Sequence, residues 1–395
     1  SLSPRQDLIA SVVYTDRRIA STDLLTNGDA RIEDDIRKDA GYQAEAQYLF
    51  RDNRFNFIAG GGTYQFQVDN KRHVDFTPSN PESCPEKFFE SKCNPDIVDF
   101  TAERSIGYLY TNVNHIKNLS LTLGLSYVSL KNVVDYEVNK FNPKLGLQWN
   151  LNNDLRLRLA WFETVKSILI ANQTLEPTQV AGFNQLFDDT NGTKAQRKGV
   201  GLDARIVGDI YGGLEASARN LNVPIFFDGD VNDQKENASK FRLFEKQQES
   251  LYRAYLYWLP SQYWIARGEF QFERYTRPVE GRNGNEPNRI ETLSVPLSLD
   301  YFNPNGIFTK FTMTYLRQGL ERQGIDEGPR DSYLLDAVLG YRLPGRRGIL
   351  SLEGRNLLNE ELFYRNGYLR SADRQLYDQR FSPGQTFFVR LTLNF

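Results

Sequence analysis

The sequence has no long apolar run. In its 395 residues nothing approaches the roughly 18 consecutive apolar residues that would mark a membrane-spanning helix, and the mean hydropathy is -0.54. A protein built on membrane helices is therefore excluded. A membrane protein of this hydropathy would have to cross the bilayer as a closed sheet, because only helices and closed sheets satisfy every backbone polar group in lipid.

Residues that carry catalysis or bind metals are also scarce. The only two histidines, His73 and His115, lie outside metal-ligand spacing of each other and of the cysteines, so no metal or other cofactor is expected. No glycine-rich phosphate loop and no GxSxG motif is present, and we therefore do not expect an enzyme. A barrel enzyme that uses dispersed Asp, His or Ser residues remains an alternative. With 48 basic against 50 acidic residues, nothing suggests a nucleic-acid partner.

Cysteine occurs only at Cys84 and Cys93, within a polar stretch rich in Pro and Asn. Neither has the neighbours that a metal site would need. A disulfide within a surface loop is expected in an oxidising compartment, and two free thiols are the alternative.

What the sequence does contain is a strict alternation of apolar and polar residues. In residues 119–127 every odd position is apolar and every even position is small or polar, which is the period of a β-strand. The same pattern recurs in 155–161, 200–206, 214–218, 264–272, 293–299, 335–341, 350–354 and 387–395. The 21 Tyr, 26 Phe and 29 Gly residues suit such strands in a membrane barrel.

The connections between these segments alternate in length. Short ones fall near 52–53, 117–118, 152–154, 208–209, 260–262, 303–306 and 344–347. Longer polar stretches lie near 19–40, 70–100, 130–137, 166–195, 221–248, 277–288, 319–330 and 359–384. Seven short turns and eight long loops predict sixteen strands with both termini on the short-turn, periplasmic side. We predict one all-β domain over 1–395, a transmembrane antiparallel up-and-down barrel. A soluble sandwich or propeller has no reason to alternate in this way.

One irregularity interrupts the pattern. Across Gly60, Gly61 and Gly62 the apolar parity changes, which predicts a β-bulge or a break in register.

The alternation also assigns charged residues to the lumen. The twelve basic ones are Lys144, Arg156, Arg158, Arg197, Arg205, Arg219, Arg253, Arg267, Lys310, Arg342, Arg355 and Arg390. The eight acidic ones are Glu45, Asp203, Glu215, Glu269, Glu273, Asp300, Asp336 and Glu353. They form either a ladder of cross-strand ion pairs that stiffens the wall or a mildly positive pore that favours anions.

Two stretches resemble known families. Residues 354–359 (GRNLLN) and 383–395, ending at Phe395, resemble the closing strands of TonB-dependent receptors, and the terminal Phe395 resembles the assembly signal of outer-membrane barrels. Residues 171–185 with 187–189 resemble the barrel of outer-membrane porins that carry an amino-terminal tetratricopeptide-repeat domain. Both resemblances imply the bacterial outer membrane.

The resemblances imply different functions. A plug, a TonB box and additional strands are not recognisable, whereas sixteen strands with a repeat domain upstream is the layout of exopolysaccharide-export porins. We therefore expect an outer-membrane channel or export conduit for a polar solute or polymer, which would be anionic if the lumen is a basic pore. The alternatives are a TonB-dependent uptake receptor and a barrel that anchors a larger complex. No signal peptide precedes residue 1, so we expect a mature or trimmed chain. The resemblances imply a periplasmic or plug domain upstream of it, or a periplasmic partner protein, and the outer-membrane lipid is the other expected partner.

Overall fold

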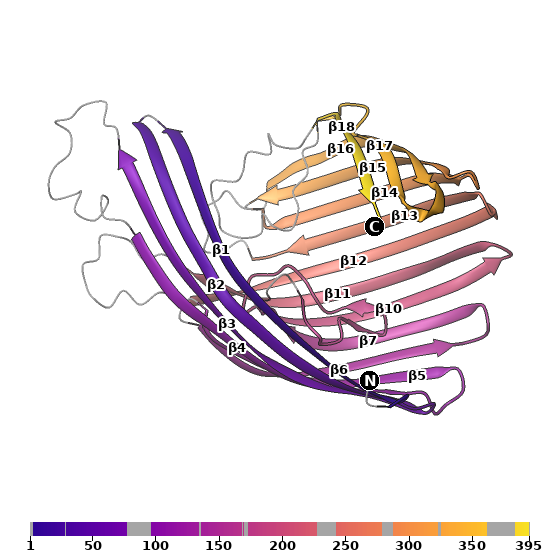
Figure 1. Cartoon of the computed structure of the whole chain (residues 1–395), viewed down its shortest axis with the longest axis horizontal. Helices are drawn as coiled ribbons and strands as arrows, with labels where there is room; N and C mark the ends of the chain where they lie inside the picture. Colours follow the sequence, from indigo (N-terminus) through magenta and orange to yellow (C-terminus); the bar gives the residue numbers. More distant parts are fainter. Residues whose placement is uncertain are drawn as a thin grey trace.

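The structure is a computed structural model that describes residues 3–27, 29–76, 96–133, 136–167, 169, 173–226, 242–278, 287–322, 325–361 and 384–394. Within them, sixteen antiparallel strands form one sheet in which each strand pairs with its neighbours along the chain (Figure 1). This order and number confirm the predicted up-and-down arrangement. No helix in the described part of the chain is long and apolar enough to cross a membrane.

The strands of the large sheet have the following bounds: β1 Gln6–Asn27, β2 Asp29–Arg51, β3 Phe55–Phe76, β4 Asp96–Val113, β5 Leu119–Val133, β6 Tyr136–Asn150, β7 Leu155–Val165, β10 Lys194–Val207, β11 Ile210–Phe226, β12 Arg242–Ser261, β13 Trp264–Thr276, β14 Arg289–Phe302, β15 Ile307–Arg322, β16 Ile325–Leu343, β17 Gly348–Arg355 and β18 Thr386–Leu393. A separate pair consists of β8 (Gln179–Val180) and β9 (Phe183–Asn184), and a 3-10 turn covers Pro344–Arg346.

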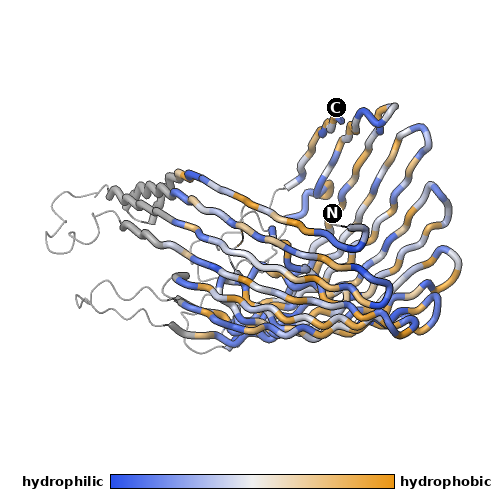
Figure 2. The backbone as a smooth tube through the Cα atoms, turned by 60° about the horizontal axis from the view of Figure 1, so that its bottom comes forward, coloured by the Kyte–Doolittle hydropathy of each residue, from blue (hydrophilic) through white to orange (hydrophobic). Residues whose placement is uncertain are grey.

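The strand register places apolar and polar residues on opposite faces of the sheet. Leu121, Leu147, Leu159 and Val200 stand opposite one another on successive strands and form one apolar row. We call the face that carries this row the outer face and the opposite one, which carries Arg158, the inner face. Because side chains alternate with period two, a slip of one residue would exchange the two sets. Figure 2 shows the resulting alternation of hydropathy along each strand.

The sheet curls so that its inner face is concave, with β1–β4 and β13–β18 on opposite sides of the hollow (Figure 1). The pairing order begins at β1 and ends at β18, and within the described residues neither pairs with a second strand. β1 begins with Gln6 opposite Phe50, and β18 ends with Leu393 opposite Gly348. Both ends of the sheet therefore lie on the short-turn side, as predicted.

All seven predicted short turns are present, each joining adjacent strands of the sheet. Glycine is required at Gly306, whose φ is 97° and whose Cβ, if present, would lie 2.6 Å from the carbonyl oxygen of Arg342.

The predicted long loops are wrong at three places. Near 19–40, 130–137 and 319–330 the strands continue, so that Asn27 pairs with Asp29, Val133 with Tyr136 and Arg322 with Ile325. The loop prediction rests on the polar composition of these stretches. A paired ladder in water needs no apolar face, because cross-strand hydrogen bonds satisfy its backbone, and composition therefore cannot mark where the strands end.

The predicted irregularity at the glycines is also wrong. Gly60, Gly61 and Gly62 pair in continuous register with β2 and β4. The apolar parity changes there because the inner face is itself apolar at this point, with Tyr64 1% exposed. A Cβ on Gly62 would lie 2.5 Å from Cγ of Glu45, so the glycine leaves room for that side chain.

Candidate functional site

The connection between β7 and β10 folds back onto the concave face. The sequence predicts a surface loop near 166–195, yet Val180 is 0% and Phe183 1% exposed. We call residues 173–189 the inner segment. Its β8–β9 pair joins Val180 to Phe183 through a turn at Ala181 and Gly182, which have φ values of 49° and 86°. In Figure 1 this small hairpin lies within the hollow of the sheet.

Glu45 of β2 holds the first part of the inner segment. Its carboxylate accepts hydrogen bonds from the backbone N–H of Leu175 (2.5 Å) and from the hydroxyl of Thr174 (3.0 Å). Arg104 Nη1 lies 3.5 Å from the same carboxylate, and both side chains are buried. A buried carboxylate with this many donors is a strong anchor, because each charge-assisted hydrogen bond is worth more than a neutral one.

Two glutamines of β2 add backbone contacts beside Glu45. Gln43 Nε2 donates to the carbonyl oxygen of residue 173 at 2.7 Å, and Gln47 Nε2 donates to that of Leu175 at 2.5 Å. The side chains of β2 therefore bind the backbone of the inner segment.

The middle of the inner segment is tied to β4 and β6. The hydroxyl of Tyr110 donates to Glu176 Oε1 at 2.7 Å and accepts from Gln185 Nε2 at 3.3 Å. Lys144, one of the predicted residues, lies with Nζ 3.9 Å from Glu176 Oε1. Tyr110 and Lys144 are 2% and 1% exposed, so these contacts are shielded from water.

Aromatic rings of the inner segment stack on arginines of β7, β10 and β11. Phe183 lies against Arg158 and Arg197, at 5.1 and 5.6 Å from ring centroid to guanidinium carbon. Phe187 lies against Arg197 and Arg219, at 5.1 and 3.5 Å. Such cation–π contacts contribute most where water is excluded. The carboxylate that follows in the segment, at position 189, additionally forms an ion pair with Arg219.

Glycines of the wall make room for the hairpin. A Cβ on Gly146 would lie 2.8 Å from Cγ1 of Val180, and one on Gly199 would collide with the ring of Phe183. Val180, Ala181 and Phe183 form a small buried apolar cluster there. The hairpin thus packs directly on the backbone of the sheet.

A cavity of about 240 Å³ remains between the inner segment and the wall. Its lining is mixed, with polar residues such as Arg104, Glu176 and Gln185 beside apolar ones such as Val128 and Phe187. Within the described part of the chain, Arg104 Nε and Gln185 Oε1 have no hydrogen-bond partner. The cavity is large enough and polar enough to hold several water molecules. In the part of the chain that the structure describes, no group of His, Cys, Asp and Glu side chains is arranged to hold a metal ion.

A family model described as TonB dependent receptor-like, beta-barrel matches residues 5–209, which is slightly more than half of the chain. The chain belongs to this family. Barrels of TonB-dependent receptors are outer-membrane proteins of Gram-negative bacteria, so the predicted location is confirmed. The predicted resemblance to TonB-dependent receptors is confirmed, although the family model matches other residues than the closing ones that suggested it. The resemblance to repeat-linked porins stays a prediction. No curated protein sequence matches the chain.

Solved structures of TonB-dependent receptors share the fold. The unliganded ferric citrate transporter FecA gives a TM-score of 0.63 at 14% identity, covering 100% of this chain and 60% of that one. The copper transporter OprC gives 0.62 at 12% identity, covering 100% and 63%. The ferripyoverdine receptor of Pseudomonas aeruginosa gives 0.58 at 11% identity, covering 93% and 51%. The chain therefore spans between half and two thirds of these structures.

Most of the predicted lumen residues form ion pairs on the inner face of the sheet. Arg158 contacts Asp203 (2.7 Å) and Glu215 (3.3 Å), and Arg197 also contacts Glu215 (3.8 Å). Further ion pairs between predicted residues are Arg253–Glu269 at 2.9 Å, Arg267–Asp300, Arg355–Glu353 at 3.5 Å and Arg390–Glu353 at 3.4 Å. Arg219 also pairs with Glu249, which was not predicted, at 2.5 Å. These contacts match the ladder alternative.

Other predicted residues form no ion pair within the described part of the chain. The basic ones are Arg156, Arg205, Lys310 and Arg342, and the acidic ones are Glu273 and Asp336. The four basic residues all lie within a few residues of a short turn, on inner-face positions of the register.

Sequence reasoning missed the residues that hold the inner segment. Gln43, Gln47, Arg104 and Tyr110 were not singled out, although all four occupy inner-face positions. One feature of the sequence could have pointed to them: the inner-face positions of β4 are largely apolar. Apolar residues on the inner face need another part of the chain to cover them. Cys84, Cys93 and Phe395 lie outside the described residues.

Proposed function

We propose that this chain is part of the barrel of a TonB-dependent receptor that takes up a polar, anionic solute across the outer membrane. The family supports uptake by a receptor over the export conduit that we expected from the sequence. The observation that carries the proposal is the inner segment, which covers the part of the concave face formed by β2–β7, β10 and β11 instead of leaving it open.

An open channel needs a free lumen, and a sheet of this size leaves one only when loops do not fold in. Here residues 173–189 are fixed by buried groups of β2, β4, β6, β10 and β11. Several such contacts must break together before the segment can leave the wall. Passage past it is therefore a controlled event, as in a receptor, and is unlike diffusion through a porin.

The charge of the inner face supports an anionic solute. Of the predicted residues, four basic and two acidic ones have no ion pair within the described residues. Arg156 and Lys310 stand opposite Asp203 and Asp300, but these carboxylates already pair with Arg158 and Arg267. The excess charge among the predicted residues is therefore positive and lies near the short turns. Unpaired Arg and Lys side chains in a lumen favour anions. The ferric citrate and ferripyoverdine proteins among the structural neighbours are named for metal complexes, and we extend a metal-carrying solute to this chain as part of the proposal.

We further propose that strands outside this chain complete the barrel. In lipid the free edges of β1 and β18 would leave backbone groups without partners. In the full-length protein, the amides of adjacent residues Val12 and Val13 should then exchange equally slowly with solvent. Fast exchange at alternate residues of β1 would show that this edge stays open.

The experiment that tests uptake uses the full-length protein in cells and in planar bilayers. Uptake of the solute should disappear when TonB is deleted, and the wild-type protein should conduct little current. Replacing residues 173–189 with a short Gly-Ser linker should raise the conductance. The conservative variant Thr174→Ala, which removes one hydroxyl, is the control and should stay closed. A stable open current in the wild type, with transport independent of TonB, would restore the channel hypothesis.

A second experiment tests the charge of the solute. Replacing Arg156, Arg205, Lys310 and Arg342 together with Ser should weaken the binding of an anionic metal chelate and reduce its dependence on salt. The control is Arg253→Ser, which removes a charge already matched by Glu269. Equal affinity for the wild type and the fourfold variant would contradict an anionic solute while leaving the receptor assignment intact.

A further inference from the structure

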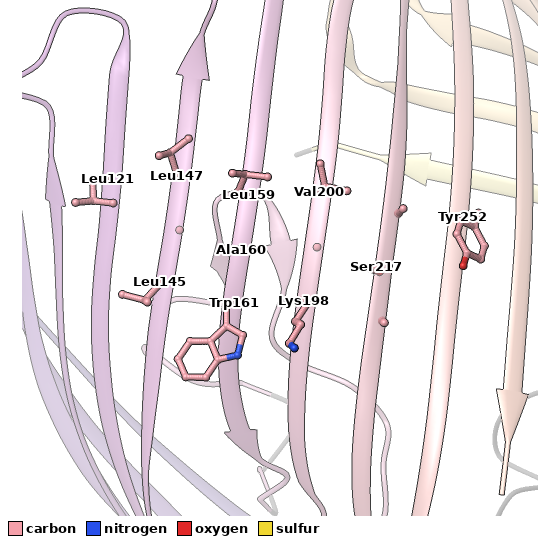
Figure 3. A pocket seen from close by; sticks show the side chains of 14 residues that line it. Leu121, Leu145, Leu147, Leu159, Ala160, Trp161, Lys198, Val200, Ser217 and Tyr252 are labelled. Atoms are coloured by element: carbon pink, nitrogen blue, oxygen red, sulfur yellow. The ribbon is translucent and has the colours of Figure 1, made fainter.

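A shallow groove of about 620 Å³ crosses the outer face of β5–β7 and β10–β12 (Figure 3). Its floor is low because Ala216 and Ala218 of β11 are small, whereas Leu159, Val200 and Tyr252 rise beside them. The lining is apolar apart from a few groups, of which Lys198 carries the only charge. This part of an outer-membrane protein faces lipid, so the groove is open to lipid molecules.

Lys198 lies at one end of the groove, next to an indole. In the register it stands opposite Trp161 on β7 and Ala218 on β11. Figure 3 shows the amino group of Lys198 beside the ring of Trp161, with Leu147 and Leu159 farther along the strands. The arrangement combines a cation and an N–H donor at one end with an apolar channel at the other.

Lys198 differs from Lys131 and Arg274, two other basic residues on the outer face. Lys131 stands opposite Glu103 in the register, and Arg274 Nε lies 2.7 Å from Glu291 Oε1. Lys198 has an aromatic and an alanine as its neighbours, and within the described residues it forms no ion pair. Its charge on this face therefore lacks an internal partner.

We propose that this groove is a binding site for a phosphate-bearing membrane lipid. The phosphate lies against the ammonium group of Lys198 and accepts a hydrogen bond from the indole N–H of Trp161. One acyl chain runs along β11 over Ala218 and Ala216, between Val200 of β10 and Tyr252 of β12. A chain in a groove contacts protein on three sides, whereas a chain on a flat wall contacts it on one, so dispersion contacts favour the groove.

The simpler alternative is that Lys198 extends to the headgroup region without a specific lipid, as long basic side chains commonly do. The two cases differ in whether the groove matters. Extension to the interface requires only the amine, whereas a bound lipid requires both the amine and the space over Ala216.

The test is a titration of the full-length protein in mild detergent with phosphatidylglycerol, followed by native mass spectrometry. Lys198→Gln should weaken binding about fivefold, the effect of one basic residue on an anionic lipid. The matched control is Lys131→Gln, which should bind as the wild type does. Diacylglycerol with the same chains should bind more weakly, and added inorganic phosphate should not displace the lipid.

A second pair of variants tests the groove itself. Ala216→Leu fills the floor and should weaken binding about tenfold, because about two methylene groups of the chain lose their contact. Ala337→Leu makes the same change on β16, outside the groove, and should have no effect. Correct assembly of each variant is checked by its heat-modifiable migration on gels. Equal binding by Lys198→Gln and Lys131→Gln, or by Ala216→Leu and Ala337→Leu, would overturn the proposal, as would equal binding of the two lipids.

Discussion

Replacing Glu45 with glutamine is the sharpest test of what holds the inner segment. The substitution keeps the shape of the side chain and removes its charge. The new amide group retains one oxygen, which can accept from Leu175 or from Thr174 but no longer as an anion. Arg104, which is 5% exposed, loses the carboxylate that lies 3.5 Å from its Nη1.

The expected cost follows from that geometry. Removing one partner of a buried ion pair costs about 3–5 kcal/mol, because the other charge stays buried without compensation. The distance of 3.5 Å between Arg104 and Glu45 is long, and the carboxylate of Glu176 still attracts the Arg104 guanidinium after the substitution. Both features place the cost at the lower end of that range. A cost of about 3 kcal/mol corresponds to a factor of about one hundred in the equilibrium between attached and detached segment. The backbone hydrogen bonds between the strands are unaffected, so the variant protein should still assemble in the membrane.

The assay is hydrogen–deuterium exchange of the full-length protein in nanodiscs, read at the amide of Leu175. Glu45→Gln should raise its exchange rate about one hundredfold, whereas Thr174→Ala, which loses one hydrogen bond to the Glu45 carboxylate, should raise it only about tenfold. The double variant Glu45→Gln/Arg104→Met should recover most of the protection, because both buried charges are gone. Unchanged exchange in Glu45→Gln, or no recovery in the double variant, would refute the argument.

Three further outcomes are expected. Leu157→Arg places a charge on the lipid face, should cost about 2–4 kcal/mol near the bilayer midplane and should reduce the heat-modifiable form on gels; normal assembly would contradict the facing assignment. Gly62→Ala should loosen the inner segment in the exchange assay because its Cβ meets Glu45, whereas Gly107→Ala, with no atom within 4 Å of the new Cβ, should not, and equal exchange in the two would argue against this contact. Cys84 and Cys93 should resist thiol labelling in the unreduced protein, and labelling of both would disprove the disulfide.

The sheet could be predicted from the sequence because two local signals suffice for it. Period-two patterns such as that of 119–127 identify a strand with one apolar face, and short turns such as 208–209 are marked by Gly and Asp. Both signals depend on neighbouring residues only. The strand number and order therefore followed from one pass along the chain.

The inner segment could not be predicted because its contacts are distant in sequence. Glu45 and Leu175 are separated by 130 residues, and nothing local to either indicates the other. The segment from 173 to 189 is polar and contains Pro177 and Gly182, which are typical of a surface loop. Its burial is decided by the concave wall, which exists only after the sheet has formed.

For the charged residues of the inner face, the sequence predicted the face but not the pairing. Alternation assigned Arg158 and Asp203 to the same face, and the register places both there. Alternation could not distinguish a paired ladder from a free basic pore, because pairing depends on which residues meet across strands. Arg158 contacts Asp203 one strand away and Glu215 two strands away, which only the register determines.

The length of the first strands has a consequence for how molecules approach this protein. β1, β2 and β3 contain 22, 23 and 22 residues. At about 3.3 Å per residue and a tilt of about 40° they rise about 55 Å, against an apolar band of about 25 Å. On the outer face of β1 an apolar run reaches Tyr14, and the charged residues Asp16 and Arg18 come next. About half of each strand thus extends beyond the lipid as part of a hydrogen-bonded sheet. Antibodies and proteases that reach its rim are still about 30 Å from the bilayer.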